Sequence, residues 1–216
     1  MELRGLIFDL DGTLLDSLAD IATAMNAALA DHGLPTHPVA AYAGFVGEGV
    51  ERLARNALPP GSEAIKPAVL DSYRAHYAER MLDATQPYPG IPDMLALLHG
   101  HGIRLAVLSN KPDAPVQKLV AVLLGGVPFV AVRGHRPDAL RKPHPAVALA
   151  LCAALGVDPS QCGFVGDSAI DMQTASAAGM VGIGVTWGFR GREELVAGGA
   201  AFLADTPGEV VRCTVP

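Results

Sequence analysis

Two acids close together follow the first apolar run of the chain. Residues 6–8 have the pattern of a buried strand, and Asp9 and Asp11 come directly after them. Because alternate residues of a strand point to the same side, we expect the two carboxylates to lie side by side, with Gly12 allowing the chain to turn. Neighbouring carboxylates repel unless a cation joins them, and Mg²⁺ favours oxygen ligands. The pattern predicts a magnesium site, and the alternative is a strand end with solvated acids.

An Asp-x-Asp-Gly sequence also opens calcium loops of the EF-hand type. Such a loop carries Glu at its twelfth position and lies between two helices. Counted from Asp9, the twelfth residue is Asp20, and an apolar strand precedes the acids. We therefore set the EF-hand interpretation aside.

Two further polar clusters lie after an apolar run and in a restricted loop. Ser109 and Asn110 follow residues 103–108, and their hydroxyl and amide groups can hold phosphate oxygens, although such residues also occur in plain turns. Lys142 lies in a loop restricted by prolines. Its ammonium could bridge Asp9 and a phosphoryl oxygen and so stabilise charge in a transition state.

A second pair of acids follows the apolar run 163–165. Asp167 ends this run, and Asp171 lies one helical turn later on the same face. The spacing fits two oxygen ligands, or one ligand and its hydrogen-bonding support, while a helix cap is the alternative. The predicted metal ligands are thus Asp9, Asp11, Asp167 and Asp171, with Asp171 acting more through hydrogen bonds or water.

The composition fits a globular protein that handles a small anion. Half of the 216 residues are hydrophobic and 18% are charged, which allows a sizeable core. The net charge is −6, and no cluster of Lys and Arg of the kind found in nucleic-acid binders is present. No apolar stretch is long enough for a membrane span, no secretory signal is evident, and the three cysteines lack CxxC spacing. We expect a cytoplasmic protein with no nucleic-acid or membrane partner, either a monomer or a weak homodimer.

The order of the predicted elements indicates an α/β fold. Residues 17–84 show only helical patterns, whereas helices and strands alternate after residue 90. Continuous apolar strands in such an order are typical of a parallel sheet covered on both faces, which binds ligands beyond the carboxyl ends of its strands. We predict a Rossmann-like core formed by residues 1–16 and 85–216, with an inserted helical cap at 17–84. The predicted helices are 17–32, 50–58, 66–81, 92–99, 116–124, 145–155, 170–178 and 193–197, and the later strands are 103–108, 129–132, 163–165, 181–185 and 201–203.

Residues 8–17, FDLDGTLLDS, resemble the first motif of the haloacid dehalogenase-like superfamily. Ser109-Asn110, Lys142 and the segment 166–171 are similar to its second, third and fourth motifs. The resemblance implies that Asp9 is a nucleophile that becomes phosphorylated, that Asp11 is the general acid/base, and that Mg²⁺ is the cofactor. It favours phosphoryl chemistry, since dehalogenases proper lack an acid at the second position. It also implies substrate contacts by Thr13, Ser109 and Asn110.

Residues 47–53, GEGVERL, and 184–188, GVTWG, resemble phosphoglycolate phosphatases. This likeness implies hydrolysis of small phosphate monoesters, with 2-phosphoglycolate as the leading substrate and Gly47 and Gly49 approaching it from the cap. Arg52, Arg55 and Lys111 are candidates for binding its carboxylate, although we expect Lys111 to be a solvated loop lysine. The segment 124–141 departs most from the family pattern. Alternatives are a phosphosugar mutase, a pyrophosphatase, or a non-catalytic binding protein on the same fold.

Overall fold

A six-stranded parallel sheet forms the centre of the molecule. The computed structural model describes residues 2–215, and the strands have the order β5-β4-β1-β6-β7-β8. Every neighbouring pair is parallel, which confirms the predicted α/β class. The strands are β1 (Gly5–Phe8), β4 (Arg104–Pro112), β5 (Ala131–His135), β6 (Cys162–Gly166), β7 (Val181–Val185) and β8 (Phe202–Ala204).

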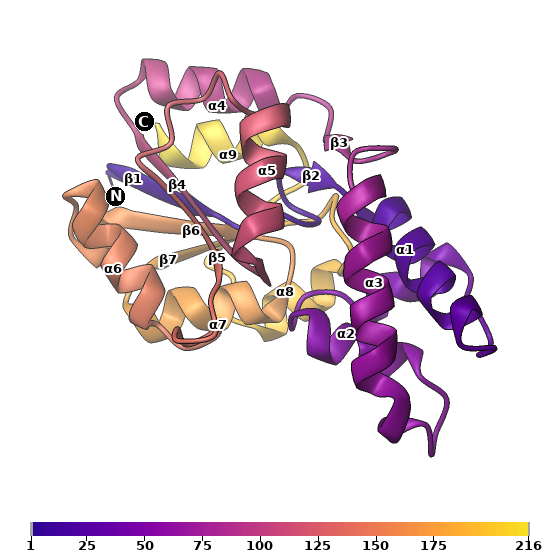
Figure 1. The fold of residues 1–216 in the computed structure, drawn as a ribbon. Coiled ribbons are helices and arrows are strands. Elements are labelled where there is room, and N and C mark those ends of the chain that lie inside the picture. The colour runs from indigo at the N-terminus through magenta and orange to yellow at the C-terminus, as the bar shows by residue number, and fades with distance from the viewer. Residues whose placement is uncertain (1, 216) are drawn as a thin grey trace.

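Helices cover both faces of the sheet (Figure 1). Leu6 and Phe8 belong to one hydrophobic cluster and Ile7 to the other, because alternate residues of a strand point to opposite faces. No helix among the described residues combines the length and apolar character needed to cross a bilayer. The first cluster includes residues of α4 (Ile91–Gly100), α5 (Asp113–Leu123) and α9 (Pro207–Thr214). The second cluster includes residues of α6 (Ala146–Leu155) and α7 (Ala169–Ala178). Helix α8 (Arg192–Ala197) packs beside α7.

The sheet grows outward from β1 in two opposite directions. From β1 the chain builds β4 and β5 on one side, then crosses over to build β6, β7 and β8 on the other. In open α/β sheets the crevice at such a reversal, beyond the carboxyl ends of the strands, is where ligands bind. Here the crevice lies between the ends of β1 and β6, which Asp9 and Asp167 follow directly.

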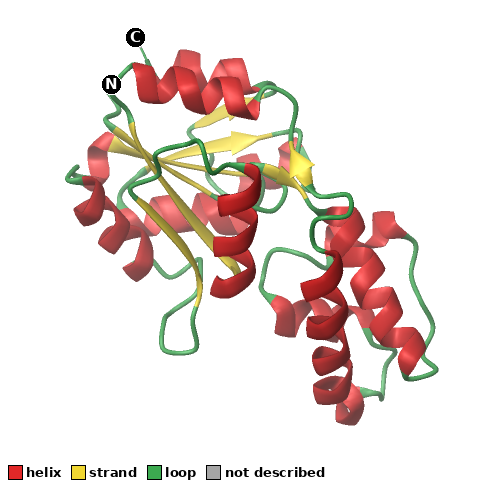
Figure 2. Ribbon diagram, turned by 45° about the horizontal axis from the view of Figure 1, so that its top comes forward, coloured by secondary structure: helices red, strands yellow, loops and turns green. Residues whose placement is uncertain are grey.

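Three helices form a separate group at one end of the molecule (Figures 1 and 2). They are α1 (Leu18–Asp31), α2 (Val50–Ala57) and α3 (Lys66–Arg80), joined by short 3-10 helices at Val39–Gly44 and Glu63–Ile65. An antiparallel ribbon of β2 (Leu15–Asp16) and β3 (Gln86–Pro87) lies where the chain enters and leaves this group. The ribbon supports our proposed division into a cap at 17–84 and a core made of the rest.

Asp20 fastens the connection that leads back from the cap to the core. Its buried carboxylate accepts hydrogen bonds from the backbone N–H groups of Ala84 (3.0 Å) and Thr85 (2.8 Å) and from the Thr85 hydroxyl (2.7 Å). A buried carboxylate requires such donors, since burial without them carries a large desolvation penalty. Asp20 therefore ties the start of α1 to the segment that leads from α3 back to β3.

Most predicted elements agree with the observed ones to within one residue at each end, but the strand predicted at 129–132 lies at Ala131–His135. The strand predicted at 103–108 continues to Pro112 with a register irregularity after Leu108, so that Ser109, Asn110 and Lys111 lie in its last part. The helix predicted at 116–124 already begins at Asp113. The sequence analysis does not predict β2, β3 or α9, and strands of two residues, such as β2 and β3, are too short to show a period.

Candidate active site

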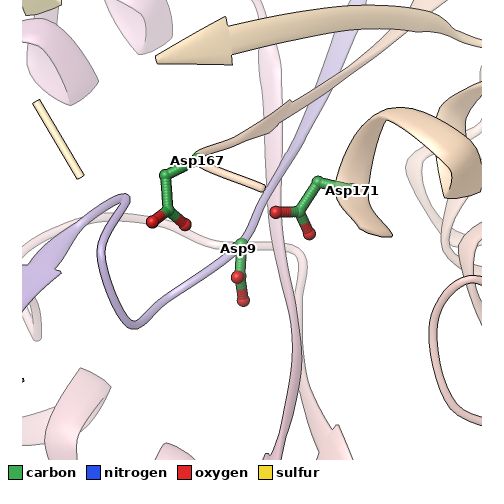
Figure 3. Close-up of side chains that lie close together, drawn as sticks. All are labelled: Asp9, Asp167 and Asp171. Atoms are coloured by element: carbon green, nitrogen blue, oxygen red, sulfur yellow. The ribbon is translucent and has the colours of Figure 1, made fainter. Parts of the chain in front are cut away.

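Three buried carboxylates converge beyond the carboxyl ends of β1 and β6 (Figure 3). Asp9 follows β1, Asp167 follows β6, and Asp171 lies in the first turn of α7. One oxygen from each lies within 4.8 Å of the others. Three of the four predicted metal ligands are thus brought together, and Asp11 lies outside this cluster.

Glycines leave the space that the cluster occupies. A Cβ atom at Gly12 or Gly188 would collide with Asp167, and one at Gly166 would collide with Asp171. Gly12 also has a φ of 84°, a conformation that side chains other than that of Gly rarely adopt. Close packing of backbone against these carboxylates therefore fixes where the acids point.

Hydrogen bonds hold the acids of the fourth motif in place. Asp167 accepts from the Phe189 backbone N–H at 2.7 Å and from the Thr13 hydroxyl at 3.3 Å. Asp171 accepts from the Ser168 hydroxyl at 2.6 Å and from its N–H at 3.1 Å, which forms a capping box at the start of α7. The Thr13 hydroxyl, predicted to contact the substrate, is directed at Asp167 in this structure.

Lys142 provides the positive charge of the cluster. Its Nζ lies 2.9 Å from Asp9 and 2.7 Å from Asp171, and the side chain is almost fully buried. The Asn110 side chain positions the same residue, since its Oδ1 accepts from the Lys142 N–H at 2.9 Å and its Nδ2 donates to the Lys142 carbonyl at 3.1 Å. Asn110 is therefore engaged with the Lys142 backbone, while Ser109 lies beside it with its Oγ accepting from the Lys111 N–H.

One lysine among three carboxylates leaves the acids short of positive charge. Burial raises the pKa of Asp9 to about 7, although Lys142 opposes the shift. Burial, with Asp171 and Asp9 nearby, also raises the pKa of Asp167 well above its usual range. Burial alone would lower the pKa of Lys142, but the negative charges of Asp171 and Asp9 have the larger effect and raise this pKa. The electrostatics of the cluster therefore favour the arrival of a further cation.

The donor set fits Mg²⁺. Three carboxylates and one ammonium carry two net negative charges when all are ionised, which a divalent cation would balance. All donors are oxygens, as hard cations prefer. The residues that would hold such an ion are Asp9 and Asp167, with Asp171 either joining them or orienting Asp9 through their shared partner Lys142.

Asp11 has a partner that the sequence does not predict. The Lys111 Nζ lies 2.8 and 2.9 Å from its two carboxylate oxygens, and the Ser17 hydroxyl donates to it at 2.6 Å. Lys111 is buried, so the expectation of a solvated loop lysine is wrong. Ser17 occupies the N-cap position of α1, but its hydroxyl bonds to Asp11 and makes no cap hydrogen bond.

A small pocket opens over both acids of the first motif. It holds about 40 Å³ of solvent space, enough for a few water molecules or a leaving group of a few atoms. Asp9, Asp11, Ser109, Asn110 and Lys111 contribute its polar lining from the core. Apolar side chains and glycines close it from the cap, namely Ile21, Val46, Gly47, Gly49, Val50, Leu53 and Tyr73.

Core side chains tie the glycine-rich cap loop down over the pocket. Asn110 Nδ2 donates to the Gly47 carbonyl at 3.1 Å, and Arg190 Nη2 donates to the Val46 carbonyl at 2.9 Å. A Cβ atom at Gly49 would lie only 3.1 Å from the Arg141 guanidinium and 3.3 Å from the Asn110 carbonyl oxygen. Both glycines have positive φ angles, 120° at Gly47 and 88° at Gly49. The predicted close approach of the two glycines to the site is thus present in the geometry.

Replacing Gly49 by Leu is expected to lift this loop from the core. We expect the variant to lose at least about tenfold in kcat/KM for a small alkyl phosphate, and much less for p-nitrophenyl phosphate, whose reactive leaving group depends less on enclosure. Gly61→Leu is the matched control, because Gly61 has a similar φ of 83° but open space around it. Equal losses in the two variants would show that backbone strain, and not the contact with the core, is responsible.

The arginines that could bind a substrate carboxylate, and two histidines of the core, do not line the pocket. Arg52 of the cap lies 3.7 Å from Glu48 on the surface, and neither it nor Arg55 lines the pocket. His99 and His101 are exposed at the end of α4 and do not line the pocket.

The sequence reading misses three contributors to the site. Phe189 holds Asp167 through its backbone, Arg190 ties down the cap loop, and Ser17 binds Asp11. The first two follow the predicted strand 181–185, so the rule that ligands gather at carboxyl ends of parallel strands could have drawn attention to them. Ser17 closes the motif 8–17, but its position before a helical pattern indicates only a helix cap and not a bond to Asp11.

Comparison with known proteins agrees with this geometry. Residues 3–179 match the model of a family described as haloacid dehalogenase-like hydrolase. A phosphoglycolate phosphatase of Rhodospirillum rubrum is 37% identical over an alignment that covers 94% of this chain and 87% of the relative. One of Mannheimia succiniciproducens is 35% identical over 84% of this chain and 85% of the relative. The crystal structure of a predicted phosphoglycolate phosphatase from Haemophilus somnus superposes with a TM-score of 0.92, at 28% identity and over 99% of both chains. The chain therefore belongs to the haloacid dehalogenase-like hydrolases.

Proposed function

We propose that this protein is a Mg²⁺-dependent phosphatase of small phosphate monoesters and that 2-phosphoglycolate is its substrate. The observation that carries the proposal is the pocket in which Asp9, Asp11 and Ser109 face a cap that encloses only a few atoms. The relatives named phosphoglycolate phosphatase support the choice of substrate. A small pocket that the cap partly covers favours a two-carbon leaving group over a hexose or a nucleoside.

The proposed reaction uses the two acids of the first motif in sequence. An Asp9 carboxylate oxygen attacks phosphorus, the bond to the ester oxygen breaks, and Asp11 donates a proton to the departing alcohol. Water then attacks the aspartyl phosphate and gives a proton to Asp11, which releases phosphate and restores Asp9. Asp11 lies at the pocket, outside the three-acid cluster, where it can serve the leaving group without competing for a metal.

Lys142 and the cap supply the remaining functions. The Lys142 ammonium, held by Asp9 and Asp171, would stabilise negative charge that develops on the phosphoryl oxygens. Bound Mg²⁺ would keep Asp9 ionised and offset the charge of the phosphate. The cap loop over the pocket would exclude bulk water from the leaving group.

A panel of phosphate esters tests this function. The purified protein with Mg²⁺ is assayed for phosphate release from 2-phosphoglycolate, glucose phosphates, nucleoside monophosphates and pyrophosphate. We expect kcat/KM to be highest for 2-phosphoglycolate, by at least about 100-fold over hexose phosphates and nucleotides. Preference for another ester would overturn the substrate assignment, and isomerisation of glucose phosphates would identify a mutase.

Metal binding is expected to be visible in the stability of the protein. Mg²⁺ at about 100 times its dissociation constant should raise the unfolding free energy by about 2.7 kcal/mol, because the ion binds the three-acid cluster of the folded state and not the unfolded chain. Asp167→Asn should remove most of this gain. Ca²⁺ should also stabilise the protein but not replace Mg²⁺ in turnover, since it prefers six to eight oxygens and often bidentate carboxylates. Thermal unfolding with each ion measures the effect, and an undiminished shift in Asp167→Asn would place the metal elsewhere.

A further inference from the structure

The pocket over the acid pair contains a second buried lysine, separate from Lys142. Lys111 extends from the end of β4, and its ammonium contacts both Asp11 oxygens. The same Nζ lies 4.7 Å from the centre of the Tyr77 ring on cap helix α3. Lys111 is therefore held between the acid of the core and an aromatic ring of the cap.

The two lysines serve different sides of the site. Lys142 is shared by Asp9 and Asp171 on the side of the three-acid cluster. Lys111 lies with Asp11, the residue placed at the leaving group in the proposed reaction. A cation on that side is not needed to neutralise the phosphoryl group, which Lys142 and the metal would already serve.

Lys111 is also the one positively charged side chain among the described residues that line this pocket. Arg52 and Arg55 of the cap, the other candidates for binding a carboxylate, do not line it. Around Lys111 the walls are apolar or aromatic, formed by residues such as Val50, Leu53 and Tyr73. In these surroundings a charge-assisted hydrogen bond to an anion is stronger than on the surface.

We propose that Lys111 is the specificity-determining residue for the leaving group and that it binds a carboxylate located one carbon from the ester oxygen. Its ammonium has three donors, of which Asp11 uses only part, so a second oxygen anion can share the cation. The Tyr77 ring of the cap makes a cation–π contact with the ammonium and so helps to hold it at the pocket. The inference rests on the proposed phosphatase function and adds the group that distinguishes one small ester from another.

The test compares three esters of similar size that differ in charge. These are 2-phosphoglycolate, ethyl phosphate, which has a methyl group in place of the carboxylate, and 2-aminoethyl phosphate, which has a cation. Each is assayed with the wild type, Lys111→Met, Lys111→Arg and the control Lys118→Met. Lys118 is exposed and lies on α5 beside the neighbouring hollow that Lys111 also borders.

We expect the wild type to prefer 2-phosphoglycolate over ethyl phosphate, and Lys111→Met to reduce this ratio of kcat/KM values by about 10- to 100-fold. Ethyl phosphate hydrolysis falls to a smaller extent, because Asp11 loses a partner in the same variant. Lys111→Arg should retain much of the ratio, and Lys118→Met should leave it unchanged. Inhibition by the product glycolate, which reports binding without turnover, should weaken in Lys111→Met and stay unchanged in Lys118→Met.

Two outcomes would overturn the inference in different ways. If the wild type prefers 2-phosphoglycolate and Lys111→Met lowers kcat/KM by the same factor for all three esters, Lys111 only positions Asp11 and the proposed function stands. If the wild type hydrolyses the three esters equally well, both the role of Lys111 and the assignment of 2-phosphoglycolate are wrong.

Discussion

The Asp9→Asn variant is expected to lose essentially all phosphatase activity while keeping its fold. Asn has almost the same shape as Asp but cannot attack phosphorus as a carboxylate, so we expect kcat to fall by about 10⁴-fold or more. Lys142 keeps its second partner, Asp171, and is not left as an unpaired buried charge. Turnover of 2-phosphoglycolate at saturating Mg²⁺ measures the loss, and circular dichroism reports the fold.

A matched control is available within the same motif. Asp16 is exposed and lies in β2, outside the pocket, so Asp16→Asn changes the net charge equally without touching the site. We expect this variant to keep wild-type activity. Substantial activity in Asp9→Asn at saturating Mg²⁺ would exclude Asp9 as the nucleophile.

The same substitution is expected to stabilise the metal-free protein, and more so at higher pH. Because burial raises the pKa of Asp9 to about 7, its neutral form stabilises the folded state fully below pH 4. That contribution is lost as the pH rises through 7 and the buried carboxylate ionises. Asn stays neutral throughout, so the advantage of the variant should grow between pH 5 and pH 8, by at most about 1.4 kcal/mol per pH unit.

Urea unfolding with EDTA at several pH values measures this difference. Added Mg²⁺ should reduce or reverse it, since the ion stabilises the ionised Asp9 of the wild type. A difference that does not change between pH 5 and pH 8 would mean that Asp9 is already ionised in the metal-free protein at pH 5.

The positions of Asp9 and Asp167 could be predicted from sequence because one topological rule governs them, whereas helical spacing places Asp171. The restricted loop and the family resemblance place Lys142. Asp9 and Asp167 each follow a strand of a parallel sheet, and the carboxyl ends of such strands meet along one edge. The rule needs only the order of the elements and not their exact ends. The same rule places Ser109 and Asn110 at this edge.

The surroundings of Asp11 could not be predicted, because they depend on where β1 ends. The spacing of Asp9 and Asp11 suggests a shared face only if the strand continues, but β1 ends at Phe8. The chain then turns, and the Leu10 carbonyl accepts hydrogen bonds from the backbone N–H groups of Thr13, Leu14 and Leu15. Asp11 is thereby directed to Lys111 and not into the three-acid cluster.

The burial of Lys111 could not be predicted for a related reason. A lysine after an apolar strand is normally solvated, and only long-range packing decides otherwise. Here cap helix α3 places the Tyr77 ring against the ammonium, and a carboxylate far away in the sequence pairs with it. Local patterns contain neither contact.

The Lys142→Met variant is expected to be both inactive and unstable without metal. Met fills a similar volume but leaves Asp9 and Asp171 buried without their shared cation. Removing one partner from a buried ion pair costs about 3–5 kcal/mol, because the remaining charge has no compensation. The loss of transition-state stabilisation should lower kcat by about 100- to 1,000-fold.

Charge balance, and not lost packing, should account for the instability of this variant. The double variant Lys142→Met/Asp171→Asn removes one of the stranded carboxylates and should regain a large part of the lost stability at pH 8. Mg²⁺ should stabilise Lys142→Met more than it stabilises the wild type, since the ion then faces three carboxylates without a competing ammonium. Lys118→Met, which removes an exposed lysine, serves as the control for a change in net charge.

Urea unfolding of the four proteins at pH 8, with EDTA or with Mg²⁺, separates the two explanations. If the packing of the Lys142 side chain were what stabilises the site, the double variant would be at least as unstable as Lys142→Met, and Mg²⁺ would restore neither. If the ammonium balances the acids, stability should follow the net charge of the cluster, rising with each carboxylate removed and with each divalent ion bound. Activity should not follow stability, because in the proposed reaction Mg²⁺ would neutralise the acids but would not replace the Lys142 ammonium beside the phosphoryl oxygens.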